Sequence, residues 1–290
     1  MWKRKVYQVT QWFLLVFVTA CASKGGPWTP EDKRPEIRQT HELLNSVLWT
    51  QTAAEFQVLA RQSYLTAQEA LDQALNDTSW TAALEQEGRY DMRPPAVILD
   101  VDETVLDNSP YEVRLILRGA AFSTDTWHEW CKEARATAIP GALEFTRYAA
   151  RKGVTVFYVT NRRHEVEEAT RKNLEMLGFP LDPKRDTLLT RGERPEWDTS
   201  DKTPRRKEVA SRHRVLLLVG DNMGDFVPIE RASVEERAQL VDKYSDYWGA
   251  RWIMLPNPQY GSWEGALFGF EYGLSDEEKL RIKYEKLQTK

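Results

Sequence analysis

The chain has 290 residues, a formal net charge of −4 and two cysteines. This length suffices for one sizeable α/β domain with an elaboration. The mildly acidic charge argues against nucleic acid or an anionic lipid surface as a partner, and no basic run beyond the first few residues points to either.

The first twenty residues have the pattern of a secretory signal peptide. A basic start, MWKRK, precedes the apolar stretch Trp12 to Val18, which is too short to span a membrane. Cys21 follows the small residue Ala20, so we expect a lipoprotein signal over residues 1–20, cleaved before a lipidated Cys21. The alternative is an ordinary secreted protein that is cleaved nearby.

A lipidated Cys21 would anchor the protein stably on a membrane surface, because each buried CH₂ of an acyl chain contributes about 0.8 kcal/mol. Ser23 and Ala22 follow the cysteine, and the lack of an Asp at the second mature position favours the outer membrane of a Gram-negative cell. The anchored protein would face the periplasm or the cell surface. Cleavage would leave Cys131 as the remaining cysteine, which excludes a disulfide framework.

Residues 21–35 read as a tether, and residues 36–290 as a single domain. Apolar residues recur at three- and four-residue spacing from 36 to about 75, which predicts one or two long helices in an N-terminal helical part over 36–90. The period then changes. Continuous apolar runs, typical of strands buried on both faces, occupy 96–102, 154–160 and 215–221, with weaker cases at 186–190 and 251–256.

Helical patterns separate these strands at 141–153, 165–178 and 204–214, and the segment from about 108 to 140 suits a small cap. Alternating strands and helices predict an α/β fold with a doubly wound parallel sheet.

Polar residues stand at the ends of three predicted strands. Asp100 and Asp102 end the first, Thr160 ends the second, and Asp221 ends the third. In doubly wound sheets ligands bind outside the carboxyl ends of the strands. We therefore expect these side chains to meet in one site, although they are far apart in the sequence.

Carboxylates dominate this expected site. Alternation in an extended segment would put Asp100 and Asp102 on one side, with Val101 facing away. Two such carboxylates ionise together only where a cation neutralises them, and oxygen ligands suit Mg²⁺. Asp221 and Asp225 lie at helical i, i+4 spacing and could face the same ion. The alternative is that these residues merely cap helices.

Four segments occur in an order that identifies a family. DVDETV, YVTNR, SDKTPRR and GDNMGDF resemble the four motifs of the haloacid dehalogenase (HAD) superfamily phosphatases. More narrowly, ILDVDETVLDNSPY, PGALEF, VFYVTNRR, VGDNMGDF and LPNPQYGSWEGAL look like the class C acid phosphatases, the bacterial lipoprotein e type. The similarity runs from the lipidation signal to Leu267.

The resemblance implies a role for each residue of the site. Asp100 would be the nucleophile that forms an aspartyl-phosphate, and Asp102 would act as general acid and then as general base. Mg²⁺ would be held by the Asp100 carboxylate, the Asp102 backbone carbonyl and Asp221. Asp225 would bind the ion through a water molecule or would contact its ligands without touching the ion. Thr160, Asn161 and Lys202 would bind the phosphoryl group. A simple helix cap at Thr160 and a surface position for Lys202 are the alternatives, and we expect Glu103 to be structural.

Aromatic residues match positions where the family builds a box around the leaving group. These are Tyr260, Trp127 and Phe122, and the turn that leads to Tyr111 would begin the same substrate wall. Base stacking of this kind would favour nucleoside 5′-monophosphates, including nicotinamide mononucleotide. Ordinary packing of the cap is the alternative. Other hypotheses are a broad acid phosphatase or phosphotransferase, or a surface-tethered binding protein, and a homodimer is compatible with the resemblance.

Overall fold

The computed structural model describes residues 41–229 and 231–288. The predicted signal peptide, Cys21 and the tether over 21–35 lie outside the described residues. The predicted N-terminal helical part is described from residue 41 onward, and the sheet and the cap lie within the described residues.

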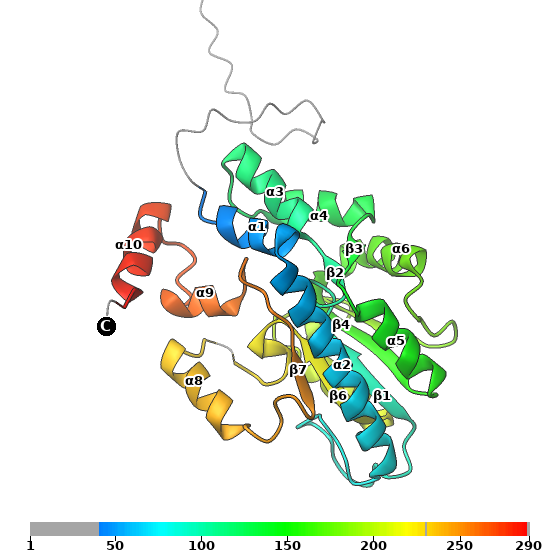
Figure 1. Ribbon diagram of the computed structural model, residues 1–290. Coiled ribbons are helices and arrows are strands. Elements are labelled where there is room, and N and C mark those ends of the chain that lie inside the picture. The colour runs from blue at the N-terminus through cyan, green and yellow to red at the C-terminus, as the bar shows by residue number, and fades with distance from the viewer. Residues whose placement is uncertain (1–40, 230, 289–290) are drawn as a thin grey trace, which may run out of the picture. The chain divides into compact units, whose positions relative to one another are not determined.

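A five-stranded parallel sheet forms the centre of the fold, in the order β5-β4-β1-β6-β7 (Figure 1). Its strands are β1 (Pro95–Leu99), β4 (Thr155–Arg163), β5 (Leu188–Arg191), β6 (Arg214–Gly220) and β7 (Trp252–Met254). Each lies within or beside one of the five apolar runs, so the predicted α/β fold with a parallel sheet is confirmed.

The strands are apolar throughout because both faces of the sheet are covered. Val97 and Leu99 join one hydrophobic cluster, whereas Ile98 belongs to the other. On the first face pack α2 (Ala54–Asn76), α5 (Ala142–Arg151) and α6 (Glu167–Leu177). On the second face packs α7 (Thr203–Arg212), together with buried aromatics from the loops. Continuous apolar runs are what such two-sided burial requires.

The predicted N-terminal helical part consists of two helices, α1 (Leu44–Thr52) and α2, which are separated at Ala53. Ala53 has φ −78° and ψ 128°, an extended conformation that breaks the helix without a Gly or Pro. Trp49 and Phe56 pack edge to face across this break, with their ring centroids 5.6 Å apart. α2 then runs along the sheet (Figure 1), where Tyr64 and Leu71 are buried.

The predicted cap region contains two helices, α3 (Ser109–Arg118) and α4 (Thr124–Glu133). They lie between two short antiparallel strands, β2 (Leu106–Asp107) and β3 (Thr137–Ala138), which fasten the ends of the segment to each other. Gly119 ends α3 in the left-handed conformation, and the Ser123 side chain caps α4. Cys131 is buried in α4, as expected of a small apolar residue, and its burial raises the pKa of the thiol to about 12.

The C-terminal part contains three helices that the apolar pattern did not predict. They are α8 (Val234–Lys243), α9 (Ser262–Leu267) and α10 (Asp276–Lys286). Neither α8 nor α10 has a buried residue, so no apolar stripe marks them in the sequence. Their starts carry capping boxes instead, at Ser233 and Ser275.

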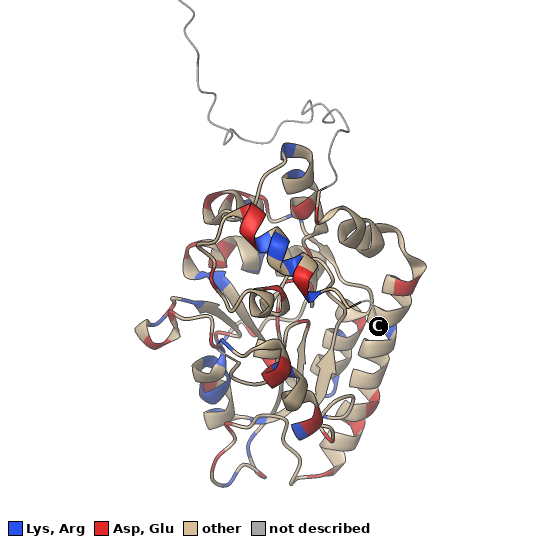
Figure 2. Ribbon diagram, turned by 90° about the vertical axis from the view of Figure 1, so that its left-hand side faces the viewer, with Lys and Arg blue, Asp and Glu red and all other residues tan. Residues whose placement is uncertain are grey.

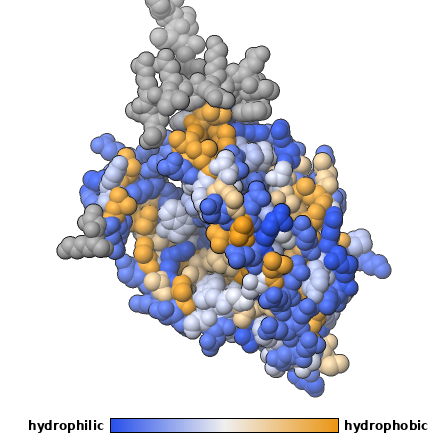
Figure 3. Space-filling view, viewed as in Figure 1, coloured by the Kyte–Doolittle hydropathy of each residue, from blue (hydrophilic) through white to orange (hydrophobic). Residues whose placement is uncertain are grey.

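The surface of the described chain is mixed in charge and hydropathy. Figure 2 shows Lys and Arg segments interspersed with Asp and Glu segments around α8, α9 and α10. Figure 3 shows apolar patches separated by hydrophilic residues on the face seen in Figure 1. Among the described residues, no helix combines the length and apolar character needed to cross a membrane.

Candidate active site

Three carboxylates from two strand ends meet at the carboxyl edge of the sheet. Asp100 directly follows β1 and Asp221 directly follows β6, while Asp225 lies in the adjoining 3₁₀ turn Met223–Asp225. One oxygen from each lies within 4.8 Å of the others. The backbone N–H of Asp100 donates to the carbonyl of Val219 at 2.9 Å, which fixes the two strand ends side by side. The convergence expected from the sheet topology therefore occurs for Asp100 and Asp221.

The cluster carries more negative charge than its protein partners neutralise. Burial raises the pKa of Asp100 to about 7; the attraction of Lys202 opposes this increase, and repulsion from Asp225 and Asp102 adds to it. Burial, followed by repulsion from Asp225 and Asp100, likewise raises the pKa of Asp221 well above its usual value. Carboxylates this close suit a hard divalent cation such as Mg²⁺, which would remove the repulsion. The residues present therefore fit the metal that the sequence predicted.

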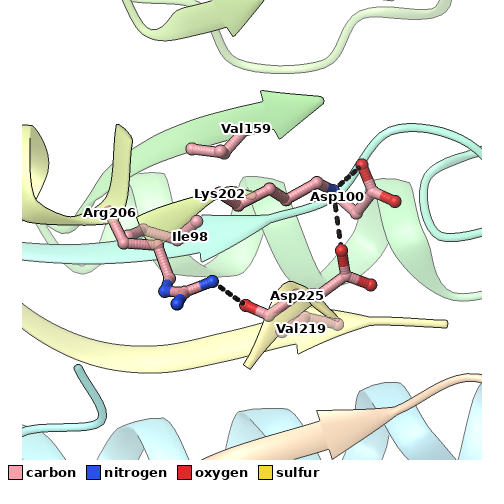
Figure 4. Close-up of a pocket in the computed structure, with 7 residues that line it drawn as sticks. All are labelled: Ile98, Asp100, Val159, Lys202, Arg206, Val219 and Asp225. Atoms are coloured by element: carbon pink, nitrogen blue, oxygen red, sulfur yellow. Dashed lines mark hydrogen bonds and ion pairs between the residues drawn. The ribbon is translucent and has the colours of Figure 1, made fainter. Parts of the chain in front are cut away.

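Lys202 supplies the positive charge of the cluster. Its Nζ lies 2.6 Å from Asp100 Oδ1 and 2.7 Å from Asp225 Oδ1. Figure 4 shows its side chain extending beside Ile98 and Val159 toward both carboxylates. The side chain is buried, so the alternative of a surface lysine is wrong. Burial lowers its pKa, but the two carboxylates outweigh that effect and raise it.

Asp225 reaches the cluster by a different local structure from the one predicted. The prediction that Asp221 and Asp225 lie one α-helical turn apart was wrong, because a 3₁₀ turn begins after Asn222. Asp225 Oδ2 accepts a hydrogen bond from the Asn222 backbone at 2.9 Å, and the Asn222 side chain caps the same turn. A side chain at Gly220 would collide with the Asp225 carboxylate, so only glycine fits at the end of β6.

The Asp102 carboxylate lies apart from these three and is held by other partners. We predicted that strand alternation would place Asp100 and Asp102 on one side. β1 ends at Leu99, so the alternation does not extend to Asp102. Its Oδ1 accepts a hydrogen bond from Arg162 Nε at 2.9 Å and another from Asn108 Nδ2 at 2.9 Å. Thr160 Oγ1 lies 3.5 Å from the other oxygen, Oδ2. The carboxylate therefore stands beside the nucleophile candidate without sharing its cluster.

Thr160 and Asn161 lie inside β4 rather than at its end, since β4 continues to Arg163. Thr160 is buried, and its hydroxyl accepts a hydrogen bond from the backbone N–H of Arg162 at 3.0 Å. Asn161 is exposed, and its side chain donates to the Ser200 carbonyl at 3.0 Å. It also accepts a hydrogen bond from Arg205 Nη2 at 2.7 Å. The loop before α7 thus holds Asn161 at the surface of the site.

Several residues that support this site were missed by sequence reasoning. Asn257 Nδ2 donates to Asp221 Oδ2 at 2.8 Å, and Thr104 Oγ1 donates to Asp221 Oδ1 at 3.2 Å. Arg205 donates to the Thr160 carbonyl as well as to Asn161. Thr104 lies in the DVDETV motif and Asn257 in LPNPQYGSWEGAL, so both stand in segments that resemble the family. Nothing in the sequence pattern, however, connected either residue to Asp221.

Glu103 is buried in the left-handed conformation, with φ 53°. Its carboxylate accepts hydrogen bonds from the Asn108 backbone at 2.7 Å and from the Tyr260 hydroxyl. Burial and repulsion from Asp102 raise its pKa well above the usual value. Glu103 therefore connects the loop after β1 to the loop after β7 that carries Tyr260. This is a structural role of the kind expected.

Three of the four predicted wall aromatics gather in the cap. The Tyr111 and Trp127 ring centroids lie 5.0 Å apart, and Phe122 lies 6.3 Å from each. Phe122 is 62% exposed, whereas Tyr111 is buried and offers no open ring face to a substrate, contrary to its predicted place in the substrate wall. Tyr260 stands apart, beside Glu103.

Comparison with known proteins agrees with this geometry. Residues 33–263 match the family described as HAD superfamily, subfamily IIIB (acid phosphatase). The structure of the class C acid phosphatase from Bacillus anthracis is similar, with a TM-score of 0.76, 36% identity and coverage of 86% of this chain and 97% of that chain. A second structure of that enzyme, with tungstate bound, gives a TM-score of 0.74 and 35% identity over the same shares.

Among curated proteins, acid phosphatase 1 from Solanum lycopersicum is 28% identical over 176 residues. That match covers 56% of this chain and 57% of the tomato protein, little more than half of its length. The family match, by contrast, includes every candidate residue from Asp100 to Tyr260. This chain therefore belongs to subfamily IIIB of the HAD superfamily, the acid phosphatases.

Proposed function

We propose that this protein is a Mg²⁺-dependent acid phosphatase that hydrolyses nucleoside 5′-monophosphates, including nicotinamide mononucleotide. One observation carries the proposal: Asp100, Asp221 and Asp225 form an oxygen cluster beside Lys202, with Asp102 held next to it. Such a cluster has the donor set for a divalent cation and the charge pattern for a phosphate ester.

In the first step, a carboxylate oxygen of Asp100 attacks phosphorus and forms a P–O bond, while the bond from phosphorus to the ester oxygen breaks. The electron pair leaves with the ester oxygen, which takes a proton from the Asp102 carboxyl group and departs as an alcohol. In the second step, the Asp102 carboxylate removes a proton from water, whose oxygen attacks phosphorus. The bond to Asp100 breaks, and inorganic phosphate leaves.

The other residues of the site hold the phosphoryl group. The Lys202 ammonium stands 2.6 Å from Asp100, where it would neutralise charge on the phosphoryl oxygens during transfer. Thr160 and Asn161 would donate hydrogen bonds to the same oxygens. Mg²⁺, held by Asp100, the Asp102 carbonyl, Asp221 and Asp225, would supply charge neutralisation for the approach of one anion to another.

Phe122, Trp127 and Tyr260 support the nucleotide preference. The Phe122 ring is exposed and the Trp127 and Tyr260 rings are partly exposed, and Tyr260, in the loop after β7, donates to Glu103 beside Asp102. Stacking of a base on an aromatic ring contributes about 1–3 kcal/mol and tolerates any base. The tungstate-bound relative supports an oxyanion site in the family fold.

The decisive experiment measures phosphate release by the protein without residues 1–21. Substrates are 5′-AMP, nicotinamide mononucleotide and p-nitrophenyl phosphate in acidic buffer, each with Mg²⁺ and with EDTA. We expect EDTA to abolish release and Mg²⁺ to restore it. If no substrate shows Mg²⁺-dependent release of phosphate, the proposal is wrong. Equal rates on all three substrates would instead indicate a phosphatase of broad specificity without a nucleotide preference.

The Asp100→Asn variant tests the nucleophile. The amide has nearly the same shape, so the fold should persist while turnover is lost. Circular dichroism and tungstate binding serve as the controls for folding and for the oxyanion site. Retained turnover would remove Asp100 from this role.

We also propose that the protein is attached to the outer membrane through lipidated Cys21, on the sequence pattern of residues 1–21 alone. The Cys21→Ala variant should then appear in the soluble periplasmic fraction, and the parent protein in the outer-membrane fraction. Identical fractionation of both would contradict the anchor.

A further inference from the structure

Arg162 lies in β4 next to Asn161, and its guanidinium is committed to a set of buried partners. The residue is 2% exposed. Nε donates to Asp102 Oδ1 at 2.9 Å, and Nη2 lies 2.8 Å from the same oxygen. Nη2 also donates to Asn108 Oδ1 at 3.0 Å, and Nη1 donates to Thr170 Oγ1 at 3.1 Å. The guanidinium thereby joins the loop after β1, the start of the cap and α6.

Asn108 completes the arrangement from the other side. It is fully buried, and its Nδ2 donates to Asp102 Oδ1 at 2.9 Å. Its Oδ1 accepts hydrogen bonds from Trp130 Nε1 at 2.8 Å and from Arg162. Because the Trp130 indole can only donate, the amide has one orientation here, with its NH₂ group toward Asp102.

These contacts distinguish the two oxygens of Asp102. Oδ1 receives N–H groups from both Arg162 and Asn108, so it has no room for a proton of its own. Oδ2 has a single described neighbour of this kind, the Thr160 hydroxyl at 3.5 Å. The oxygen that can carry and transfer a proton is therefore Oδ2, and its direction is set by what holds Oδ1.

We infer that Arg162 is a positioning residue, which works with Asn108 to clamp Asp102 Oδ1 so that Oδ2 faces the leaving oxygen of the ester. This inference rests on the proton-transfer role proposed for Asp102. A planar guanidinium with several N–H groups fits this task, because it fixes the plane of the carboxylate as well as its position. The Trp127 ring centroid lies 5.4 Å from the guanidinium carbon, so the cap also contacts Arg162.

The test compares leaving groups. Hydrolysis of glycerol 2-phosphate expels a poor leaving group that needs a proton, whereas p-nitrophenyl phosphate expels a good one that does not. Loss of a general acid lowers the rate by about 10²- to 10⁴-fold where the proton is needed. We expect Asp102→Asn to lower kcat/KM far more for the alkyl ester, and Arg162→Gln to lower the alkyl-to-aryl ratio by about 10- to 100-fold.

Two further variants separate positioning from stability. Arg162→Lys keeps a positive charge at the buried position and serves if the Arg162→Gln protein does not fold. An ammonium group cannot form the planar clamp, so the alkyl-to-aryl ratio of kcat/KM should fall in this variant too. Arg214→Gln is the matched control, because Arg214 is a buried arginine that donates to the carbonyls of Ala74 and Asp77. It should lower the unfolding temperature and leave the ratio unchanged.

The double variant Arg162→Gln/Asp102→Asn should show no fall in the ratio beyond that of Asp102→Asn, since Arg162 acts through Asp102. If Asp102→Asn selectively loses activity on the alkyl ester but folded Arg162 variants keep the parental alkyl-to-aryl ratio, the inference is overturned. If Asp102→Asn itself slows both esters equally, the proton-transfer role of Asp102 falls, and the inference falls with it.

Discussion

The hydroxyl of Tyr64, in the middle of α2, donates a 2.5 Å hydrogen bond to the backbone carbonyl of Thr104. Thr104 in turn donates from its side chain to Asp221. Gly141 adjoins the Tyr64 ring in a left-handed conformation, and a Cβ there would lie 3.0 Å from the ring. α2 therefore helps to support the loop after β1, which carries Thr104.

Tyr64→Phe should lower the free energy of unfolding by about 1–3 kcal/mol, because the Thr104 carbonyl would stay buried without its donor. Urea denaturation measures the change. Tyr90→Phe is the control, since the Tyr90 hydroxyl donates to the Ser79 carbonyl at an exposed position and its loss should have little effect. Equal effects of the two substitutions would contradict this account of Tyr64.

Asn257→Ala should weaken Mg²⁺ binding by about 10- to 100-fold, the usual effect of removing a group that orients a metal ligand. Asn257 holds Asp221 Oδ2 at 2.8 Å, and without it the carboxylate can rotate. The measurement is phosphate release as a function of Mg²⁺ concentration, and saturating Mg²⁺ should restore most of the rate. Asn76→Ala, at an exposed helix end, is the control. An unchanged Mg²⁺ dependence in Asn257→Ala would count against Asp221 as a ligand.

Tyr260→Ala should lower kcat/KM for 5′-AMP by about 5- to 150-fold, equivalent to the loss of 1–3 kcal/mol of stacking. The aryl substrate p-nitrophenyl phosphate should be affected much less. Tyr272→Ala, which removes a tyrosine that is 65% exposed and lies outside the site, should change neither rate. A parallel loss on both substrates would show that Tyr260 supports the site and not the base.

Glu112→Gln should change how stability depends on pH. Burial, with a smaller contribution from Glu264, raises the pKa of Glu112 from 4.5 to about 7 in the folded protein. Below pH 4.5 the group is neutral in both states and costs nothing. Between pH 4.5 and 7 the unfolded chain ionises while the folded protein keeps its proton, so the unfolding free energy of the parent falls by up to about 3 kcal/mol.

The Gln variant lacks this titration, so its advantage over the parent should grow between pH 4.5 and 7 and then level off. Urea unfolding at a series of pH values measures it. Glu129→Gln, at an exposed position of α4, is the control for the change from Glu to Gln. A constant difference between Glu112→Gln and the parent would show that Glu112 is ionised in the folded protein.

Local pattern predicted much of the fold because burial leaves a direct trace in composition. Strands covered on both faces are apolar along their length, so β1, β4 and β6 were found from continuous runs of aliphatic and aromatic residues. α8 and α10 escaped for the opposite reason, since they bury no residue and carry only capping signals. The same limit applies to Asp225, whose 3₁₀ turn depends on Asn222 and not on an apolar period.

The sequence by itself determined which residues could do the chemistry: carboxylates at strand ends must meet at one edge of a parallel sheet, wherever they lie in the chain. Only the tertiary structure decided how each is held. Lys202 is buried between Asp100 and Asp225, and Asp102 is turned away by Arg162. The positions of the strands along the chain follow from a short-range hydrophobic pattern. The direction of a carboxylate depends instead on donors from distant elements, which no local pattern identifies.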